Sequence, residues 1–347
     1  MAEYTTREML EAIQITPPVR NFLTRTFFPR EATHITEKVE FDVKKGKRIM
    51  APFVSPRIGG KVITRQGYQT KEFTTPRIAP ERVLSIDDIS KRMAGEGIYS
   101  SKTPSEREDD LLAQDYRELD DSIVRRLEWM CRQVLFEGKL DVVDKEAGVD
   151  LQVDYGFTNI IALTSDKYWS LPTSNPLPLL KQRRRKIIKE TGKAPNILLF
   201  AANLIDTFID NPFIQKNMDV RRMQNIEIHP QIVDDALTYY GKIAELGLDI
   251  YSYDEYFLND NGKEEGIIPE GACLMAHTGG IGQIEYGLIT QIEDKKFHSY
   301  EAKQVPKIYC DEKSEVKMFR LTSRPLPRPI DVESWCVIYP NGQGEEV

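Results

Sequence analysis

The chain has 347 residues, 40% of them hydrophobic, which is enough for two domains or for one elaborated domain with a substantial core. Its 47 basic and 54 acidic residues give a net charge of −7, and this excess of acid argues against a surface built to clamp nucleic acid. The first ten residues carry charges where a signal peptide needs an apolar core, and the longest apolar run, residues 197 to 202, is too short to span a bilayer. We therefore expect a soluble protein that is cytoplasmic at synthesis and has no membrane partner.

The cysteines lack the paired spacing of a disulfide framework or a CxxC zinc site. They are Cys131, Cys273, Cys310 and Cys336. Cys273 and His277 could approach one metal ion, but the other ligands would have to come from unrelated parts of the chain. We expect the cysteines to be small core residues, and we expect no metal and no cofactor.

Residues 1 to 36 combine large apolar side chains with little regular structure. A short helix is predicted over residues 5 to 14, and the pair Pro17 and Pro18 ends it. The apolar groups that follow are Phe22, Leu23, Phe27 and Phe28. A segment of this kind needs another surface to lie on, and we expect neighbouring molecules to provide it.

Residues 37 to 80 have the pattern of an extended hairpin. Val39, Phe41 and Val43 alternate with charged residues, which predicts a half-buried strand, and residues 61 to 65 and 71 to 75 predict further strands. The prolines at 52, 56, 76 and 80 place this hairpin at an edge, because each would remove a hydrogen bond from a central strand. A long isolated hairpin is barely stable in water, so we expect neighbouring molecules to order it.

The strongest local signal predicts one long helix over residues 104 to 137. Thr103 as N-cap, Pro104 in the first turn and Glu106 form a capping box, and Gly138 is a C-terminal stop. Apolar residues recur between them at spacings of three and four, at Leu112, Tyr116, Leu119, Ile123, Leu127, Met130 and Val134. At 1.5 Å per residue the helix would span about 50 Å.

The remainder alternates predicted strands and helices. The predicted elements are a hairpin through Ala147 and Gly148, a helix over 175–192, a buried strand over 196–201, a helix over 203–215 capped by Asn203, helix in the first half of 229–247, a hairpin at Asn261 and Gly262, and two strands separated by a proline-rich crossing in 314–340. The basic run Lys181 to Lys186 could touch nucleic acid, but no aromatic residues are interleaved for stacking. We interpret it as a solvated helical face paired with acidic neighbours.

Residues 277 to 287, HTGGIGQIEYG, resemble a nucleotide-binding loop. As a dinucleotide fingerprint the loop has Gly280 and Gly282 but places Glu285 where the third glycine belongs. As a P-loop it places Leu288 where the lysine belongs. The residues that follow favour a strand, so we predict a turn between two strands and no nucleotide site.

The sequence predicts no catalytic residues. No histidine lies in HExxH and no serine lies in a G-x-S-x-G elbow. Adjacent carboxylates such as Asp87 with Asp88 lack a third orienting group and are interpreted as solvated surface.

An aromatic N-terminal segment, a long hairpin, one very long helix and a mixed remainder occur here in the order found in the major capsid proteins of tailed phages. The chain resembles the lambda-type major head protein, or capsid protein E, family. The stretches that carry the resemblance are YTTREML, FFPREATHITEKVEFD, MAPFVSPRIGGKVI, KEFTTPRIAPE and RRLEWMCRQVLFEGK.

The resemblance implies an α+β fold of the Hong Kong 97-like capsid type. It divides the chain into an N-terminal arm (1–36), an extended E-loop hairpin (37–82), a peripheral domain (83–170 and 301–327) with a spine helix at about 104–137, and an axial domain (171–300 and 328–347). The glycine-rich turn would then lie in the axial domain.

The resemblance also implies a function, a location and partners. The protein would be a major capsid protein that self-assembles, through hexamers and pentamers, into the icosahedral shell around the DNA genome of a tailed phage or prophage. It would be found in the virion, and in the host cytoplasm during assembly. A scaffold, a portal, a maturation protease and a decoration protein are implied partners, with non-specific contact to packaged DNA. The residues expected at subunit interfaces are Phe22, Phe27, Phe28, Ile49, Phe53, Val54 and Ile58.

Some members of this fold join subunits covalently through a lysine in the E-loop and an asparagine in a late strand. Lys44, Lys45 and Lys61 are present here, but no asparagine lies between Asn261 and Asn341, so we expect no such crosslink. Two alternatives stay open: a nucleotide-binding enzyme that uses residues 279–287, and another self-assembling virion protein such as a tail-tube subunit.

Overall fold

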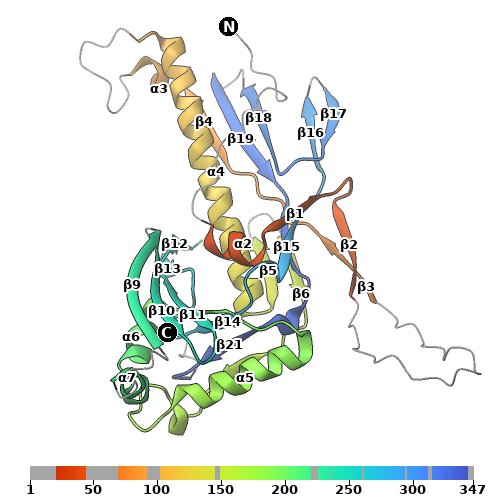
Figure 1. Cartoon of the computed structure of the whole chain (residues 1–347). Helices are drawn as coiled ribbons and strands as arrows, with labels where there is room; N and C mark the ends of the chain where they lie inside the picture. Colours follow the sequence, from red (N-terminus) through yellow and green to blue (C-terminus); the bar gives the residue numbers. More distant parts are fainter. Residues whose placement is uncertain are drawn as a thin grey trace, which may run out of the picture.

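The computed structural model describes residues 21–43, 69–91, 102–144, 149–219, 226–234, 236–259, 262–293, 295–311 and 315–342. Its axis is the long helix α4 (Pro104–Phe136), which has β-structure at both ends (Figure 1). A seven-stranded sheet lies beyond the C-terminal end of α4, and a three-stranded sheet packs along its N-terminal half. None of the described helices is long and apolar enough to cross a membrane.

Helix α4 begins at Pro104, as predicted, and ends at Phe136, one residue before the predicted end. The Thr103 hydroxyl accepts a hydrogen bond from the Glu106 amide, and the Glu106 carboxylate accepts one from the Thr103 amide at 2.7 Å, which is the predicted capping box. Gly138, at φ +72°, follows the last turn. A Cβ atom there would lie 2.2 Å from that of Phe157, so only glycine fits this end of the helix.

The seven-stranded sheet holds most of the core. Its strands, in spatial order, are β7 (Ile160–Ala162), β21 (Trp335–Tyr339), β14 (Cys273–Ala276), β8 (Ile197–Phe200), β11 (Leu248–Tyr253), β10 (Leu237–Ile243) and β9 (Ile226–Asp234). Every residue of β8 and of β14 is buried, as predicted for the run at 197–200. The helices α5 (Pro176–Thr191), α6 (Ala202–Ile209) and α7 (Pro212–Asp219) flank this sheet.

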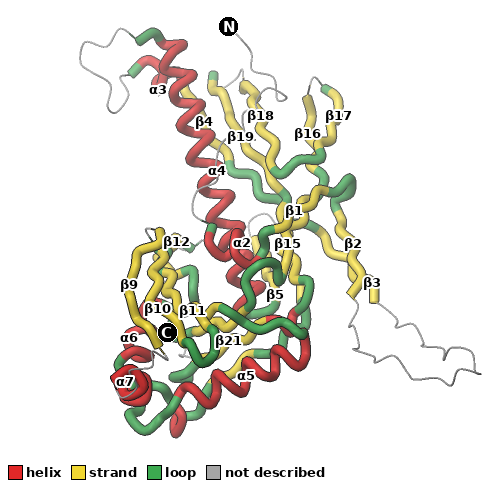
Figure 2. The backbone as a smooth tube through the Cα atoms, in the orientation of Figure 1, coloured by secondary structure: helices red, strands yellow, loops and turns green. Residues whose placement is uncertain are grey.

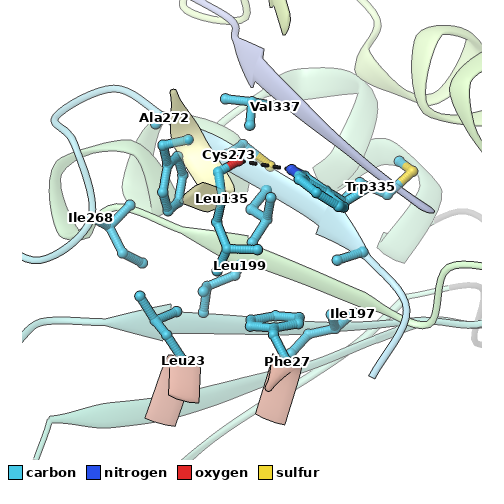
Figure 3. Close-up of a cluster of buried hydrophobic side chains, with 14 of the residues drawn as sticks. Leu23, Phe27, Leu135, Ile197, Leu199, Ile268, Ala272, Cys273, Trp335 and Val337 are labelled. Atoms are coloured by element: carbon cyan, nitrogen blue, oxygen red, sulfur yellow. Dashed lines mark hydrogen bonds between the residues drawn. The ribbon is translucent and has the colours of Figure 1, made fainter. Parts of the chain in front are cut away.

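The end of α4 is tied to this sheet by a tryptophan. The Trp335 indole N–H donates to the Leu135 carbonyl oxygen at 2.8 Å, which connects β21 to the last turn of α4 (Figure 3). Burial of both groups makes this hydrogen bond a fixed link between distant parts of the chain.

The other strands and α-helices of the described chain are arranged as two three-stranded sheets, four hairpins and two short helices. The sheets, each in spatial order, are β18 (Gln304–Asp311), β19 (Val316–Ser323) and β4 (Glu81–Ser85), and β1 (Arg30–Thr33), β15 (Gly282–Tyr286) and β20 (Pro325–Pro329). The hairpins are β2 (Lys38–Val43) with β3 (Gln69–Thr74), β5 (Lys139–Asp144) with β6 (Val149–Asp154), β12 (Tyr256–Leu258) with β13 (Glu264–Gly266), and β16 (Ile289–Glu293) with β17 (Lys296–Tyr300); the helices are α2 (Phe22–Phe27) and α3 (Ile86–Ser90).

The hairpin β2–β3 confirms the strand pattern predicted around Val39. In the described part of the chain its two strands pair only with each other, and Figure 2 shows them projecting away from the body. The predicted strand at 61–65 and the prolines at 52 and 56 lie outside the described residues.

Two predicted helices differ in the structure. Residues 229–234 lie in β9 and residues 237–243 form β10, two antiparallel strands, because β-branched and aromatic residues in this stretch suit a sheet that continues beside β11. Residues 203–215 form two helices, because Asn211 interrupts them and donates side-chain hydrogen bonds to the carbonyl oxygens of Trp169 and Ser174. Asn203 is not the cap: its side-chain oxygen accepts a hydrogen bond from the Gly271 amide.

The predicted proline-rich crossing is itself a strand, β20, so residues 315–340 contain three strands. Pro325, Pro327 and Pro329 lie opposite Tyr286, Ile284 and Gly282 of β15. Because they are two residues apart, their missing amides all fall on the same side of the strand, which is the free edge of this sheet. An edge strand therefore tolerates prolines that a central strand would not.

Candidate functional site: the N-terminal segment docked on the long helix

Residues 21 to 36 are built into the subunit that contains them. The side chains of Leu23, Phe27 and Phe28 are 0%, 0% and 1% exposed. Figure 3 shows Leu23 and Phe27 pointing toward the cluster formed by the seven-stranded sheet and α4. Strand β1 then continues the segment by pairing in parallel with β15. The expectation that residues 21 to 36 lie on other molecules is therefore corrected.

A glutamate of α4 caps the short helix α2. The N-cap of α2, Asn21, makes no side-chain capping bond. Instead the Glu128 carboxylate accepts from the amides of Leu23 at 2.6 Å and Thr24 at 3.0 Å, and from the Thr24 hydroxyl at 2.7 Å. These amides are the free donors of the first turn of a helix, and a carboxylate there also complements the helix dipole. One side chain thus fixes α2 to α4 across more than one hundred residues of sequence.

The capping carboxylate lies in an apolar setting. Burial raises the pKa of Glu128 to about 7, although the hydrogen bonds from Thr24 and Leu23 act in the opposite direction. Burial also raises the pKa of the Cys131 thiol, and the charge of Glu128 raises it further. Desolvation is therefore the largest influence on the pKa of Glu128. The carboxylate that joins α2 to α4 takes up a proton more readily than an exposed glutamate does.

A second buried carboxylate, Glu285, fixes β15 to β1 and β20. It accepts from Arg328 Nε at 2.7 Å, lies 2.8 Å from His34 Nε2, and accepts from Gln283. Burial by itself raises the pKa of Glu285, but the hydrogen bonds from His34, Gln283 and Arg328 hold it below the usual range. This is the residue found where a dinucleotide loop needs its third glycine, and its charge is neutralised within the chain.

The glycine-rich loop is the predicted turn between two strands. It joins β14 to β15, and Gly279 and Gly280 take φ values of +91° and +105°. No helix follows whose N-terminus could hold a phosphate. A Cβ atom at Gly282 would lie 2.3 Å from the Phe28 ring and 2.8 Å from the Arg328 carbonyl oxygen. Gly282 is therefore required for close packing of the N-terminal segment.

We expect Gly282→Ala to lower the free energy of unfolding by about 2 to 3 kcal/mol, because the Phe28 ring and a backbone carbonyl must both move. Denaturant unfolding of the purified subunit measures this loss, and titration of the wild-type protein with ATP and NAD measures nucleotide binding. A variant as stable as the wild type that has lost nucleotide binding would instead support the enzyme alternative.

Cys273 and His277, the pair considered as metal ligands in the sequence, have different surroundings in the structure. Cys273 is buried in β14, and His277 Nδ1 lies 2.9 Å from the Ala194 carbonyl oxygen. Within the described ranges no group of three or more His, Cys, Asp or Glu side chains is arranged to hold a metal ion.

The residues expected at interfaces have different positions. The complete burial of Phe27 and Phe28 leaves them no surface for another subunit, so their assignment to an interface is corrected. Phe22 is partly buried, with its ring centroid 5.4 Å from that of Tyr253. Ile49, Phe53, Val54 and Ile58 lie outside the described residues, as do Lys44, Lys45 and Lys61. Leu23 and Phe27 are four residues apart, which is the spacing of one helical face, and this signal could have indicated docking.

Glu128 is a functional residue that sequence reasoning missed. A carboxylate in the apolar stripe of a long helix is a weak signal, because nothing in the sequence indicates that a distant helix N-terminus will meet it.

Known proteins resemble this chain over nearly its whole length. The model of the family described as phage major capsid protein E matches residues 5–338. The major capsid protein of Escherichia phage lambda is 24% identical over 331 residues, which cover 94% of this chain and 96% of that protein. The major capsid protein of Enterobacteria phage P21 is 22% identical over 346 residues, covering 97% and 99%.

Solved structures share the fold. The capsid protein of a prophage from Escherichia coli CFT073 aligns with a TM-score of 0.71 and 17% identity, covering 98% of this chain and 99% of that one. A phage-related protein from Bordetella bronchiseptica RB50 aligns with a TM-score of 0.59 and 11% identity, covering 99% of each chain. The mixed α and β architecture is thus a phage capsid fold, and the match of the family model over residues 5–338 shows that the chain belongs to the phage major capsid protein E family.

Proposed function

We propose that this chain is the shell-forming subunit of the head of a tailed phage or prophage, and that its role is structural and not catalytic. The observation that carries the proposal is the match of the capsid family model to residues 5–338. Self-assembly is the activity: many copies bury surface against one another, and modest contacts sum to a stable shell.

The form of the subunit supports this role. The hairpin β2–β3 projects from the body without a further strand partner in the described chain. In the hairpin β16–β17, Ile292 and Phe297 lie opposite each other and are 50% and 79% exposed. Apolar groups this exposed gain about 25 cal/mol for each Å² removed from water when a neighbouring copy covers them. Phe22, Ile49, Phe53, Val54 and Ile58 stay proposed contacts.

We assign the described elements to the parts of a Hong Kong 97-like subunit with two changes of boundary. Strand β7 pairs with β21, so residues 160–170 belong with the axial domain. The hairpin β16–β17 contacts β18, with Gln291 Nε2 donating to the Pro306 carbonyl oxygen at 3.3 Å, so residues 289–300 belong with the peripheral domain. Helix α4 takes the place of the spine helix, and β2–β3 that of the E-loop.

The same proposal names partners and location. The subunit would form hexamers and pentamers in the virion shell and be present in the host cytoplasm during assembly. A scaffold, a portal, a maturation protease and a decoration protein would act on or with it. No covalent crosslink between subunits is expected.

Negative-stain electron microscopy of the purified protein tests the proposal. We expect closed shells of uniform diameter, because the contacts between copies close on themselves. Open tubes would support a tail-tube subunit. Discrete small particles that bind ATP or NAD would support an enzyme, and either result contradicts the capsid role.

A further inference from the structure

Helix α5 carries a concentration of positive charge that the acidic residues described by the structure neutralise only in part. Its cations, with the lysine that follows it, are Lys181, Arg183, Arg184, Arg185, Lys186, Lys189 and Lys193. Only one acid, Glu190, lies among them. The charge pattern predicts acidic neighbours paired with this face, and the structure shows which of the cations have them.

Two of the cations have acidic partners. Lys181 Nζ lies 2.6 Å from a Glu245 carboxylate oxygen, and Lys186 Nζ lies 4.0 Å from one of Glu190. The side chains of the other five form no ion pair and no hydrogen bond with any described residue, and the buried Nε atoms of Arg183 and Arg184 have no hydrogen-bond partner there. The expected pairing is therefore wrong for most of the helix.

The position of these charges makes them available to another molecule. Leu177, Leu180 and Ile187 form the buried face of α5, whereas Arg185 and Lys189 are exposed on the opposite face. In Figure 1 that opposite side of α5 is not covered by any described element. The positive charge of α5 is also felt at Cys336 in the sheet beneath. Burial raises the pKa of this thiol to about 12, whereas the charges of Arg183 and Lys186 lower it because they favour the thiolate.

We propose that the exposed face of α5 binds the phosphate backbone of duplex DNA without reading its sequence. The proposal rests on the proposed function, in which the shell encloses DNA. Guanidinium groups donate paired hydrogen bonds to phosphate oxygens, and ammonium groups add point charge. A helix of sixteen residues is about 24 Å long, and duplex DNA carries one charge per about 1.7 Å of axis, so several phosphates lie within its reach.

The chemistry of the face favours this ligand over a base-reading site. No aromatic side chain lies in α5 on which a base could stack. Its exposed positions are Pro178, Gln182, Arg185, Lys189 and Glu190, so the exposed charge is two cations and one acid. Contacts between cations and phosphates weaken as the salt concentration rises and do not depend on the base sequence. Such contacts suit a shell that must hold a genome of any sequence and later release it.

The test is a salt titration of DNA binding by the full-length protein, diluted until light scattering shows no assembly. Fluorescence anisotropy of a labelled duplex gives the affinity at several NaCl concentrations. The double substitution Arg185→Gln with Lys189→Gln should reduce the slope of log affinity against log salt by about 2, because each lost phosphate contact contributes about 0.9. The matched control, Lys242→Gln with Lys303→Gln, removes the same charge from cations paired with Asp249 and Glu31 and should leave the slope unchanged.

Equal effects of the two double substitutions would show that only net charge matters, and would overturn the proposal. An unchanged slope together with loss of shells in the microscope would mean that α5 contacts an acidic face of another subunit, and would also overturn it. The proposed function is judged separately, since wild-type protein that forms no shells contradicts that function whatever the DNA titration gives.

Discussion

Glu128→Ala is expected to lower the free energy of unfolding of the subunit by about 3 kcal/mol. The substitution removes the acceptor for the amides of Leu23 and Thr24 and for the Thr24 hydroxyl, and Glu128 and Thr24 are buried. A buried donor left without a partner costs about 1 to 3 kcal/mol, and water that enters the vacated space recovers part of that cost. Denaturant unfolding of the unassembled protein gives the change in free energy, and limited proteolysis should show faster cleavage near residues 21 to 28.

Glu128→Gln is the matched control, and it isolates the titration of this one group. The pKa of Glu128 is raised by burial from 4.5 to about 7, so between these values the folded chain holds a proton that the unfolded chain releases. The stability that this proton provides is complete below pH 4.5 and is lost as the pH rises through 7. Relative to the glutamine variant, the wild type should lose on the order of 3 kcal/mol over this window.

The sign of that pH dependence decides whether burial governs the junction. If the hydrogen bonds from α2 outweighed desolvation, the pKa of Glu128 would lie below 4.5 and the difference between the two proteins would grow with pH. A difference that is constant from pH 4.5 to 8 would show that Glu128 does not titrate there.

Those parts of the fold that depend on local signals could be predicted from the sequence. Thr103, Glu106 and Gly138 fix both ends of α4, because capping uses residues within one turn. Gly192 ends α5 in the same way, at φ +78°. The alternation around Val39 predicted the hairpin strand, since one face of a strand repeats every second residue.

The parts that depend on distant partners could not be predicted. Residues 229–247 carry apolar groups at spacings that suit either a helix or a strand, and only the neighbouring strand β11 decides between them. The prolines of β20 looked like a crossing, because the sequence does not reveal that their side of the strand is a free edge. The docking of α2 depends on Glu128, more than one hundred residues away.

The substitution Phe27→Ala, which truncates a side chain that docks α2, is expected to cause the second large loss of unfolding free energy. The Phe27 side chain is 0% exposed and lies in the cluster that joins α2 to the seven-stranded sheet. Truncation of a buried phenylalanine to alanine leaves a cavity and costs about 3 to 5 kcal/mol. The loss should appear in the denaturant unfolding of the unassembled subunit, where no neighbouring copy is present.

Phe297→Ala provides the comparison, because the same residue type is 79% exposed on β17. We expect it to change the free energy of unfolding of the subunit by no more than about 0.5 kcal/mol, and to reduce the yield of shells if a neighbour covers it. The reverse pattern, a stable Phe27→Ala subunit that fails to assemble, would return Phe27 to the interface. The pair of substitutions thus separates residues that fold the subunit from residues that join subunits, because unfolding of the dilute subunit reports only the first and shell yield responds to the second.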